Sequence, residues 1–165
     1  MINAIHLYRL ARWLYLHHIP VLPRICMLII FLCYNCSIPY SADIGRGTFL
    51  NHGGIGVLIN ANVRIGKNCK IGNNVSIVGQ GPYKNAPRLG DRIYIGPGAV
   101  IQGPVIIGDN VIIAPNAVVN KSVRSHMIVA GVPAKIIGDT RRLGYDIFKD
   151  EGFNNDIKPF LKKLD

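Results

Sequence analysis

The chain has 165 residues, enough for one domain with a buried core. Apolar residues make up 49% of it and charged residues 17%, a balance that excludes a disordered chain. The formal net charge of +10 leaves three classes of partner open: nucleic acid, an anionic membrane, or an anionic small molecule or polymer. Nucleic acid is the least favoured of these, because no long basic run and no familiar nucleic-acid motif is present.

The first 36 residues are predicted to form two helices. Residues 3–18 carry apolar side chains at helical spacing, with Arg9 and Arg12 on another face. Pro20 and Pro23 end this pattern, and a second helix is predicted from Arg24 to Tyr34. Two interpretations remain compatible with each other. One is a cap over the end of the domain that follows, and the other is a helix pair that lies on a membrane surface.

The cysteines predict neither a disulfide framework nor a zinc site. One C-x-x-C pair is present, but no second pair or nearby histidine completes a ligand set. We therefore expect free thiols in a reducing cytoplasm and no metal. The four cysteines are Cys26, Cys33, Cys36 and Cys69. No signal peptide is evident, so we expect a cytoplasmic protein, with contact to the inner face of the membrane left open.

A six-residue repeat organises residues 37–138. Aliphatic residues recur at every sixth position, small or β-branched residues follow four positions later, and glycine often comes directly after the aliphatic residue. The anchors are Ile38, Ile44 and Leu50, then Ile59, Ile65, Ile71, Ile77, Tyr83, Leu89, Ile95, Ile101, Ile107, Ile113 and Val119. Tyr83 is the one anchor that is not aliphatic.

A period of six fits a short strand and a tight turn, stacked as the flat faces of a parallel β-helix. The anchors point inward, each stabilising the fold by roughly 1.5–3 kcal/mol when buried. Cys69 falls on an inward position and is interpreted as core. Residues 139–165 form a C-terminal extension in this division, with a short amphipathic helix predicted over Asp156–Leu164.

Two interruptions of the repeat are the candidate functional sites, since repeat proteins often place function where the repeat breaks. The spacing from Leu50 to Ile59 is nine instead of six, and the extra residues include His52. The second interruption is the segment 79–87, whose Gly- and Pro-rich composition is that of a loop.

The hexads resemble those of the left-handed β-helix acyltransferases. This resemblance implies triangular coils of three hexads each and a homotrimer with active sites between neighbours. The run H-G-G-I-G-V-L-I-N from His52 and the tail A-G-V-P-A-K-I-I-G from Ala130 are similar to the serine acetyltransferase branch and to its relatives in surface-polysaccharide gene clusters. So is the N-terminal stretch from Tyr8 to Leu14. The resemblance covers roughly residues 5–138 and implies acetyl-CoA as co-substrate.

The family resemblance assigns roles to residues of this chain. His52 is the expected general base, because a neutral imidazole can take the acceptor's hydroxyl proton near pH 7. His126 is expected to be structural. The residues implied for CoA are Gly96, Pro97, Ala114, Pro115, Asn120 and Lys121, together with Lys135 as the partner of a CoA phosphate. A backbone carbonyl or amide is expected to orient His52, unless a neighbouring subunit supplies an acid.

Three positions depart from the serine acetyltransferase pattern. Ser37 and Asn51 stand where that family has aspartates, and Ala86 stands where it has a second histidine. Free serine is thus disfavoured, and a saccharide hydroxyl in surface-polysaccharide synthesis is expected, with Asn51, Tyr83 and Ala86 contacting the acceptor. Tyr83 stacking on a sugar ring and simple loop packing remain equally open. No complex with cysteine synthase is expected.

Other functions stay open as alternatives. They are serine O-acetylation and N-acetylation of an amino-sugar, both enzymatic, and a non-catalytic β-helix that only binds. A γ-type carbonic anhydrase is excluded, since it needs three zinc histidines and the repeat region holds only His52 and His126.

Overall fold

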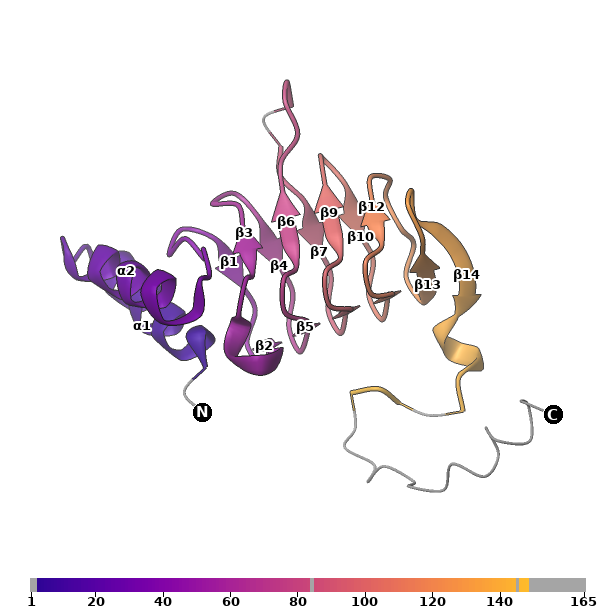
Figure 1. Ribbon diagram of the computed structural model, residues 1–165, viewed down its shortest axis with the longest axis horizontal. Coiled ribbons are helices and arrows are strands. Elements are labelled where there is room, and N and C mark those ends of the chain that lie inside the picture. The colour runs from indigo at the N-terminus through magenta and orange to yellow at the C-terminus, as the bar shows by residue number, and fades with distance from the viewer. Residues whose placement is uncertain (1–2, 84, 145, 149–165) are drawn as a thin grey trace.

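The structure, a computed structural model, describes residues 3–83, 85–144 and 146–148. The chain winds into a β-helix whose faces are three sheets, and a pair of helices lies at its N-terminal end (Figure 1). Among the strands that the structure describes, every pairing is parallel except that between β13 and β14. The parallel β-helix of hexapeptide repeats predicted from the sequence is confirmed.

The three faces are named sheets A, B and C. Sheet A contains β3 (Leu58–Ile59), β6 (Ser76–Val78), β9 (Val100–Gln102) and β12 (Val118–Val119). Sheet B contains β1 (Asp43–Ile44), β4 (Arg64–Ile65), β7 (Arg88–Leu89) and β10 (Ile106–Ile107). Sheet C contains β2 (Phe49–Leu50), β5 (Lys70–Ile71), β8 (Tyr94–Ile95), β11 (Ile112–Ile113), β13 (Met127–Ala130) and β14 (Lys135–Asp139).

The aliphatic anchors fill the interior in columns. Ile71 pairs with Ile95 on the next turn, and Ile77 pairs with Ile101. All the aliphatic anchors are buried, whereas Tyr83 is 60% exposed. Tyr83 is therefore not an anchor: it lies in the loop of residues 79–87, which stands out from one edge of the β-helix (Figure 1). Because the strands before and after this loop stay in register, the extra residues loop outward.

Helix α1 (Ala4–Leu16) closes the N-terminal end of the β-helix. The first turn has no preceding turn to supply hydrogen bonds, and side chains of α1 supply them instead. Tyr8 Oη donates to the carbonyl of Ala42 at 2.7 Å and accepts from the amide of Ile44 at 3.3 Å. The Arg9 guanidinium donates to the carbonyls of Ile44 and Gly45 at 2.5 Å. Buried backbone groups on the open edge are satisfied in this way.

Helix α2 (Leu22–Tyr34) packs on α1 and starts two residues before the predicted Arg24. Pro23 lies in its first turn, where a residue without an N–H loses no helical hydrogen bond. Proline therefore begins this helix instead of preceding it. Neither described helix is long and apolar enough to cross a membrane.

The C-terminal end of the described chain folds back on sheet C. β13 continues the parallel stack on β11, and β14 returns antiparallel beside β13. The turn between them bonds to β12, since Ala134 donates to the carbonyl of Val118 at 2.8 Å. The helix predicted over Asp156–Leu164 lies outside the described residues. The division into residues 1–36, 37–138 and 139–165 stays a prediction.

Candidate active site

The turns that join the three sheets stack into three edges of the β-helix. The CA edge joins sheet C to sheet A and contains residues 51–57, 72–75, 96–99 and 114–117. The AB edge contains residues 60–63, 79–87, 103–105 and 120–122. The BC edge contains residues 45–48, 66–69, 90–93, 108–111 and 124–126. Predicted site residues on the same edge lie close together, and those on different edges are separated by a sheet.

His52 lies on the CA edge, in the short 3-10 segment Asn51–Gly54 that follows β2. Its side chain is exposed, and its backbone is left-handed with φ 51° and ψ 35°. Such a conformation is uncommon for a residue other than glycine and is frequent at functional sites. Gly53 and Gly54 follow with φ of 77° and 96°. The nine-residue interruption is thus a tight outward turn that presents an imidazole to solvent.

Residues at the start of α1 contact the turn that carries His52. Asn3, the N-cap of α1, donates from Nδ2 to the carbonyl of Leu50 at 2.6 Å, directly before the turn. A Cβ added at Gly54 would lie 2.8 Å from Leu50 Cδ1 and 3.4 Å from the Cβ of Ala4. The turn that carries His52 is therefore packed against α1, which fixes its backbone.

Four residues predicted to bind CoA lie on the same edge as His52. The stack is continuous, because Asn74 donates to Ile55, Gly98 to Asn73 and Asn116 to Pro97, each backbone bond at 2.9 Å. Gly96 and Pro97 belong to the third turn of this edge, and Ala114 and Pro115 to the fourth. With about 4.8 Å between adjacent strands, the edge runs roughly 14 Å beyond the His52 turn.

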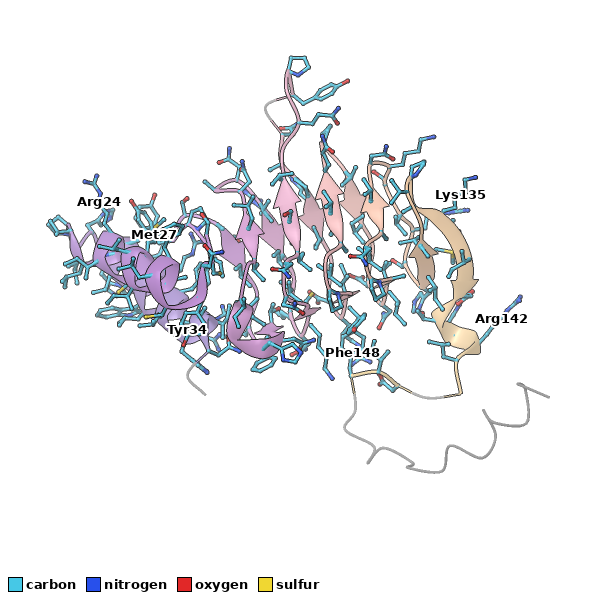
Figure 2. The ribbon with its side chains drawn as sticks, viewed as in Figure 1. Arg24, Met27, Tyr34, Lys135, Arg142 and Phe148 are labelled. Carbon is cyan, nitrogen blue, oxygen red and sulfur yellow. The ribbon has the colours of Figure 1, made fainter. Side chains whose placement is uncertain are left out.

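The packing of these glycines is close. A Cβ at Gly96 would lie 2.4 Å from the backbone nitrogen of Pro115. Lys135 is exposed and starts β14 opposite Ala130, where the chain leaves the far end of sheet C. Figure 2 shows its side chain pointing away from the β-helix. His52 and Lys135 thus lie at opposite ends of the stack of turns.

The AB edge holds the remaining predicted site residues. Tyr83 and Ala86 lie in the loop of residues 79–87, and Asn120 and Lys121 are exposed in a later turn of the same edge. Sheet A separates this edge from the one that carries His52. A single chain therefore does not bring Tyr83 or Ala86 together with His52, as a shared acceptor site would need.

Ala86 lines a polar pocket of about 340 Å³ beside the AB edge. Three arginines surround this pocket, namely Arg12, Arg64 and Arg88. Asn51, in contrast, lines a groove of about 650 Å³ on sheet C. In one chain, the predicted acceptor residues Ala86 and Asn51 therefore line two different cavities.

The groove on sheet C was not predicted from the sequence. Its lining residues are Gly47, Phe49, Asn51, Asn68, Lys70, Arg92 and Phe148. Arg92 donates to the carboxylate of Asp146 at 2.8 Å, and its guanidinium carbon lies 4.7 Å from the Phe148 ring centroid. Residues 146–148 thus return to the β-helix from the C-terminal extension. The outward position of Lys70, directly before the anchor Ile71, was the sequence signal for a basic sheet C.

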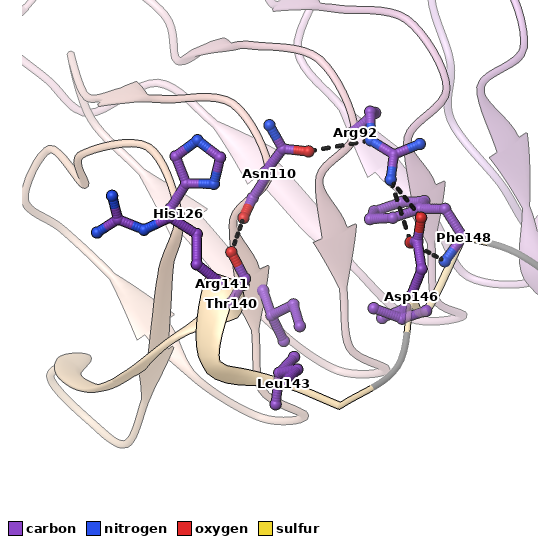
Figure 3. Close-up of a pocket in the computed structure, with 10 residues that line it drawn as sticks. Arg92, Asn110, His126, Thr140, Arg141, Leu143, Asp146 and Phe148 are labelled. Atoms are coloured by element: carbon purple, nitrogen blue, oxygen red, sulfur yellow. Dashed lines mark hydrogen bonds and ion pairs between the residues drawn. The ribbon is translucent and has the colours of Figure 1, made fainter.

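His126 lies on the BC edge, away from His52, beside a second pocket shown in Figure 3. Its carbonyl accepts from the amide of Thr140 at 2.9 Å, and Thr140 Oγ1 donates to the carbonyl of Asn110 at 3.0 Å. Arg92 Nε donates to Asn110 Oδ1 at 3.0 Å. The two bonds of Thr140 tie the segment after β14 to the BC edge, so the backbone of His126 has a structural role.

Each of the three carboxylates in the first part of the β-helix has a partner within the same chain. Asp91 Oδ1 accepts from the amide of Lys67, and Asp109 Oδ1 accepts from the amide of Asp91, both at 2.7 Å on the BC edge. Asp43 pairs with Arg12 at 3.4 Å. Within the described part of the chain, the imidazole of His52 makes no hydrogen bond, so the expected carbonyl or amide that would orient it is not found there.

The buried thiols are not candidate nucleophiles. Burial raises the pKa of the Cys36 thiol to about 12, and burial likewise raises the pKa of Cys69, which has no exposed surface. A thiol with such a pKa stays protonated near pH 7. All four cysteines are free, and the interpretation of Cys69 as a core residue agrees with its burial.

Comparisons with known proteins agree with this geometry. The family described as bacterial transferase hexapeptide (six repeats) matches residues 86–121. The serine acetyltransferase of Staphylococcus xylosus is 34% identical over 167 residues, which cover 99% of this chain and 76% of that protein. The serine acetyltransferase of Synechococcus elongatus is 35% identical over 137 residues, 82% of this chain and 56% of that protein.

A solved structure gives the same result. Serine acetyltransferase from Brucella abortus strain S19, in complex with coenzyme A, superposes with a TM-score of 0.78 at 32% identity and covers 83% of this chain. The chain is a hexapeptide-repeat transferase. Within that class, it belongs to the serine acetyltransferase family. It spans only 55% of the Brucella protein and 56% of the Synechococcus protein. Membership of the family therefore does not by itself assign the activity of these longer proteins to this chain.

The packing of Gly54 predicts a specific sensitivity. Gly54→Ala places a Cβ against Leu50 and forces a residue other than glycine to φ of 96°, at a cost of about 1–3 kcal/mol. The free energy of unfolding from urea titrations measures the loss. Gly79→Ala is the matched control, since nothing lies within 4 Å of its added Cβ. Equal stability of the two variants would contradict a packed His52 turn.

Proposed function

We propose that the protein is an acetyl-CoA-dependent O-acetyltransferase with His52 as its general base. One observation carries the proposal: the exposed imidazole of His52 stands on a packed turn at one end of the CA edge, which also carries Gly96, Pro97, Ala114 and Pro115. With acetyl-CoA as the donor, we further propose that the protein acts in the cytoplasm.

In the proposed reaction, one imidazole takes up a proton and later returns it. Neutral His52 takes the proton of the acceptor hydroxyl as its oxygen attacks the thioester carbonyl. A C–O bond forms, the C–S bond breaks, and the imidazolium returns its proton to the departing thiolate. Backbone N–H groups of the CA edge would stabilise the developing oxyanion, since backbone amides can form an oxyanion hole.

The residues of the chain also suit an elongated anionic donor. Lys135 and Lys121 supply exposed ammonium groups near the end of the β-helix opposite His52, where a CoA phosphate would be held. The relatives' structures support the same donor, since the Brucella enzyme was solved with coenzyme A. The thioester would then lie at the His52 end of the edge.

We further propose a homotrimer whose sites lie between subunits. The support is the separation of Tyr83, Ala86, Asn120 and Lys121 from His52 by sheet A. A cyclic assembly would place the AB edge of one copy against the CA edge of the next. Both groups of predicted residues would then line one cleft.

Mixing two defective variants tests this arrangement. His52→Ala disables the CA edge, and Lys121→Glu weakens donor binding at the AB edge by charge reversal. Hybrid trimers refolded from both would contain sites with one intact edge from each chain, so thiol release should rise above the sum of the separate variants. If activity never exceeds that sum, each site is built from one chain. Sedimentation equilibrium gives the mass of the hybrids.

Serine is the acceptor that the comparisons favour. The relatives are named serine acetyltransferases, and the Neisseria gonorrhoeae relative was solved in complex with serine. The names of these relatives therefore favour serine over a saccharide as the acceptor.

The composition of the two edges favours a saccharide hydroxyl. No aspartate or glutamate occurs in the CA or AB edge segments. The Asp43 carboxylate, in the pocket that Ala86 lines, is paired with Arg12 at 3.4 Å, so neither edge offers a free carboxylate to the ammonium of serine. A bound ammonium without a counter-charge is costly. On this ground we propose a saccharide acceptor, with serine as the second candidate.

An acceptor panel distinguishes the candidates. Thiol release from acetyl-CoA is measured with N-acetylglucosamine, glucosamine and L-serine. A preference for a saccharide hydroxyl would appear as transfer to N-acetylglucosamine. Asn51→Asp should raise kcat/KM for serine about tenfold, because it adds a carboxylate beside His52. Asn110→Asp adds the same charge on the BC edge, outside the groove that Asn51 lines, as a control. Efficient transfer to serine by the unaltered protein would overturn the saccharide assignment.

The proposed base is tested by substitution. His52→Ala should lower the thiol-release rate about 10²–10⁴-fold, since general-base catalysis contributes that much, while the free energy of unfolding changes little for an exposed side chain. His126→Ala is the matched histidine control on the BC edge and should retain activity. Equal rates for His52→Ala and the unaltered protein would remove His52 from the mechanism.

A further inference from the structure

The outer face of α2 is apolar along the whole helix. Pro23, Cys26 and Ile30 are buried, and Cys26 packs with Ala11 and Leu14 of α1. The large apolar residues on the remaining faces of α2 are exposed: Leu22, Ile25, Leu28, Ile29, Phe31 and Leu32. Leu32 is 71% exposed. A soluble helix normally shows polar residues there.

Helix α1 adds to the same kind of surface. Leu10, Trp13 and Leu16, spaced three residues apart, are each about half exposed. Single exposed apolar residues are ordinary, but this many on one helix pair is not. Figure 2 shows the two helices projecting from the end of the β-helix, with Arg24, Met27 and Tyr34 among their side chains.

The charges of this region have one sign. Residues 1–42 contain no aspartate or glutamate. Arg9 and Arg12 donate to carbonyls of the first β-helix turn, so they serve the fold. Arg24, the one charged residue of α2, is exposed. An apolar face bordered by a cation and by no carboxylate matches an anionic lipid surface.

We propose that the exposed faces of α1 and α2 dock on an anionic membrane surface. With 13 residues, α2 is about 20 Å long, shorter than the roughly 30 Å hydrocarbon core, so it would lie in the plane of the interface. A second copy of the chain would present the same acid-free surface and leave Arg24 without a carboxylate. The lipid phosphate supplies that counter-charge. The docking depends on neither the acceptor nor His52.

Vesicle flotation with the full-length protein tests the proposal. The vesicles contain either phosphatidylcholine alone or phosphatidylcholine with phosphatidylglycerol. The unaltered protein should float with the anionic vesicles and less with the neutral ones. Leu28→Gln with Leu32→Gln should lower the bound fraction at least about tenfold, because both exposed side chains lose their apolar contact. Ile106→Gln, at a residue 62% exposed on β10, is the matched control and should float normally.

A second variant keeps the test independent of folding defects. Arg24→Gln should reduce binding to anionic vesicles to the neutral level without changing the circular dichroism spectrum. The proposal is overturned if the unaltered protein does not float, or if the two leucine substitutions leave flotation unchanged. It is also overturned if, without vesicles, these substitutions split a larger assembly into trimers, because a second copy would then occupy the face.

Discussion

The hydrogen-bond ladder between successive turns is the interaction on which this structure depends. Each strand is only a few residues long, and it is ordered because its backbone groups bond to the turn on either side. A stack of this kind must end, and at its N-terminal end the partner is a set of side chains. Tyr8 and Arg9 occupy the open edge of the first turn as another turn would. Without them, buried backbone groups would face an apolar helix.

This closure also bears on the candidate site. His52 belongs to the first complete turn of the β-helix, next to the helix that closes it. Asn3 and Ala4 touch the residues on either side of the outward turn, so the same helix that ends the ladder also supports the imidazole. The chain thus combines a structural requirement with the positioning of a side chain for chemistry.

The six-residue periodicity was sufficient to predict the fold, because burial of one residue in six is a local property of a stacked turn. Ile71 and Ile95 could be assigned to the interior from spacing alone. Tyr83 falls on the six-residue spacing but is exposed, because a position in an inserted loop can match the spacing by chance. The rule that proline ends a helix places Pro23 before α2, whereas Pro23 lies in the first turn of α2, where a helix tolerates proline.

The site was less predictable than the fold. The spacing predicts that His52 lies in an outward turn. Which residues share its edge depends on which two sheets each turn joins, and the spacing alone does not give this. Phe148 reaches sheet C from the C-terminal extension, and Arg92 contacts it there. Contacts between segments this far apart in the sequence carry no periodic signal. Spacing also says nothing about which edges of different copies meet.

The loop of residues 79–87 shows how this architecture separates stability from recognition. The strands on either side keep their register although the loop adds residues at a corner. A corner of a β-helix can therefore be lengthened or rewritten while the interior columns stay the same. Divergence among such proteins can proceed by exchanging single corners, and a neutral acceptor can replace a charged one without a new scaffold.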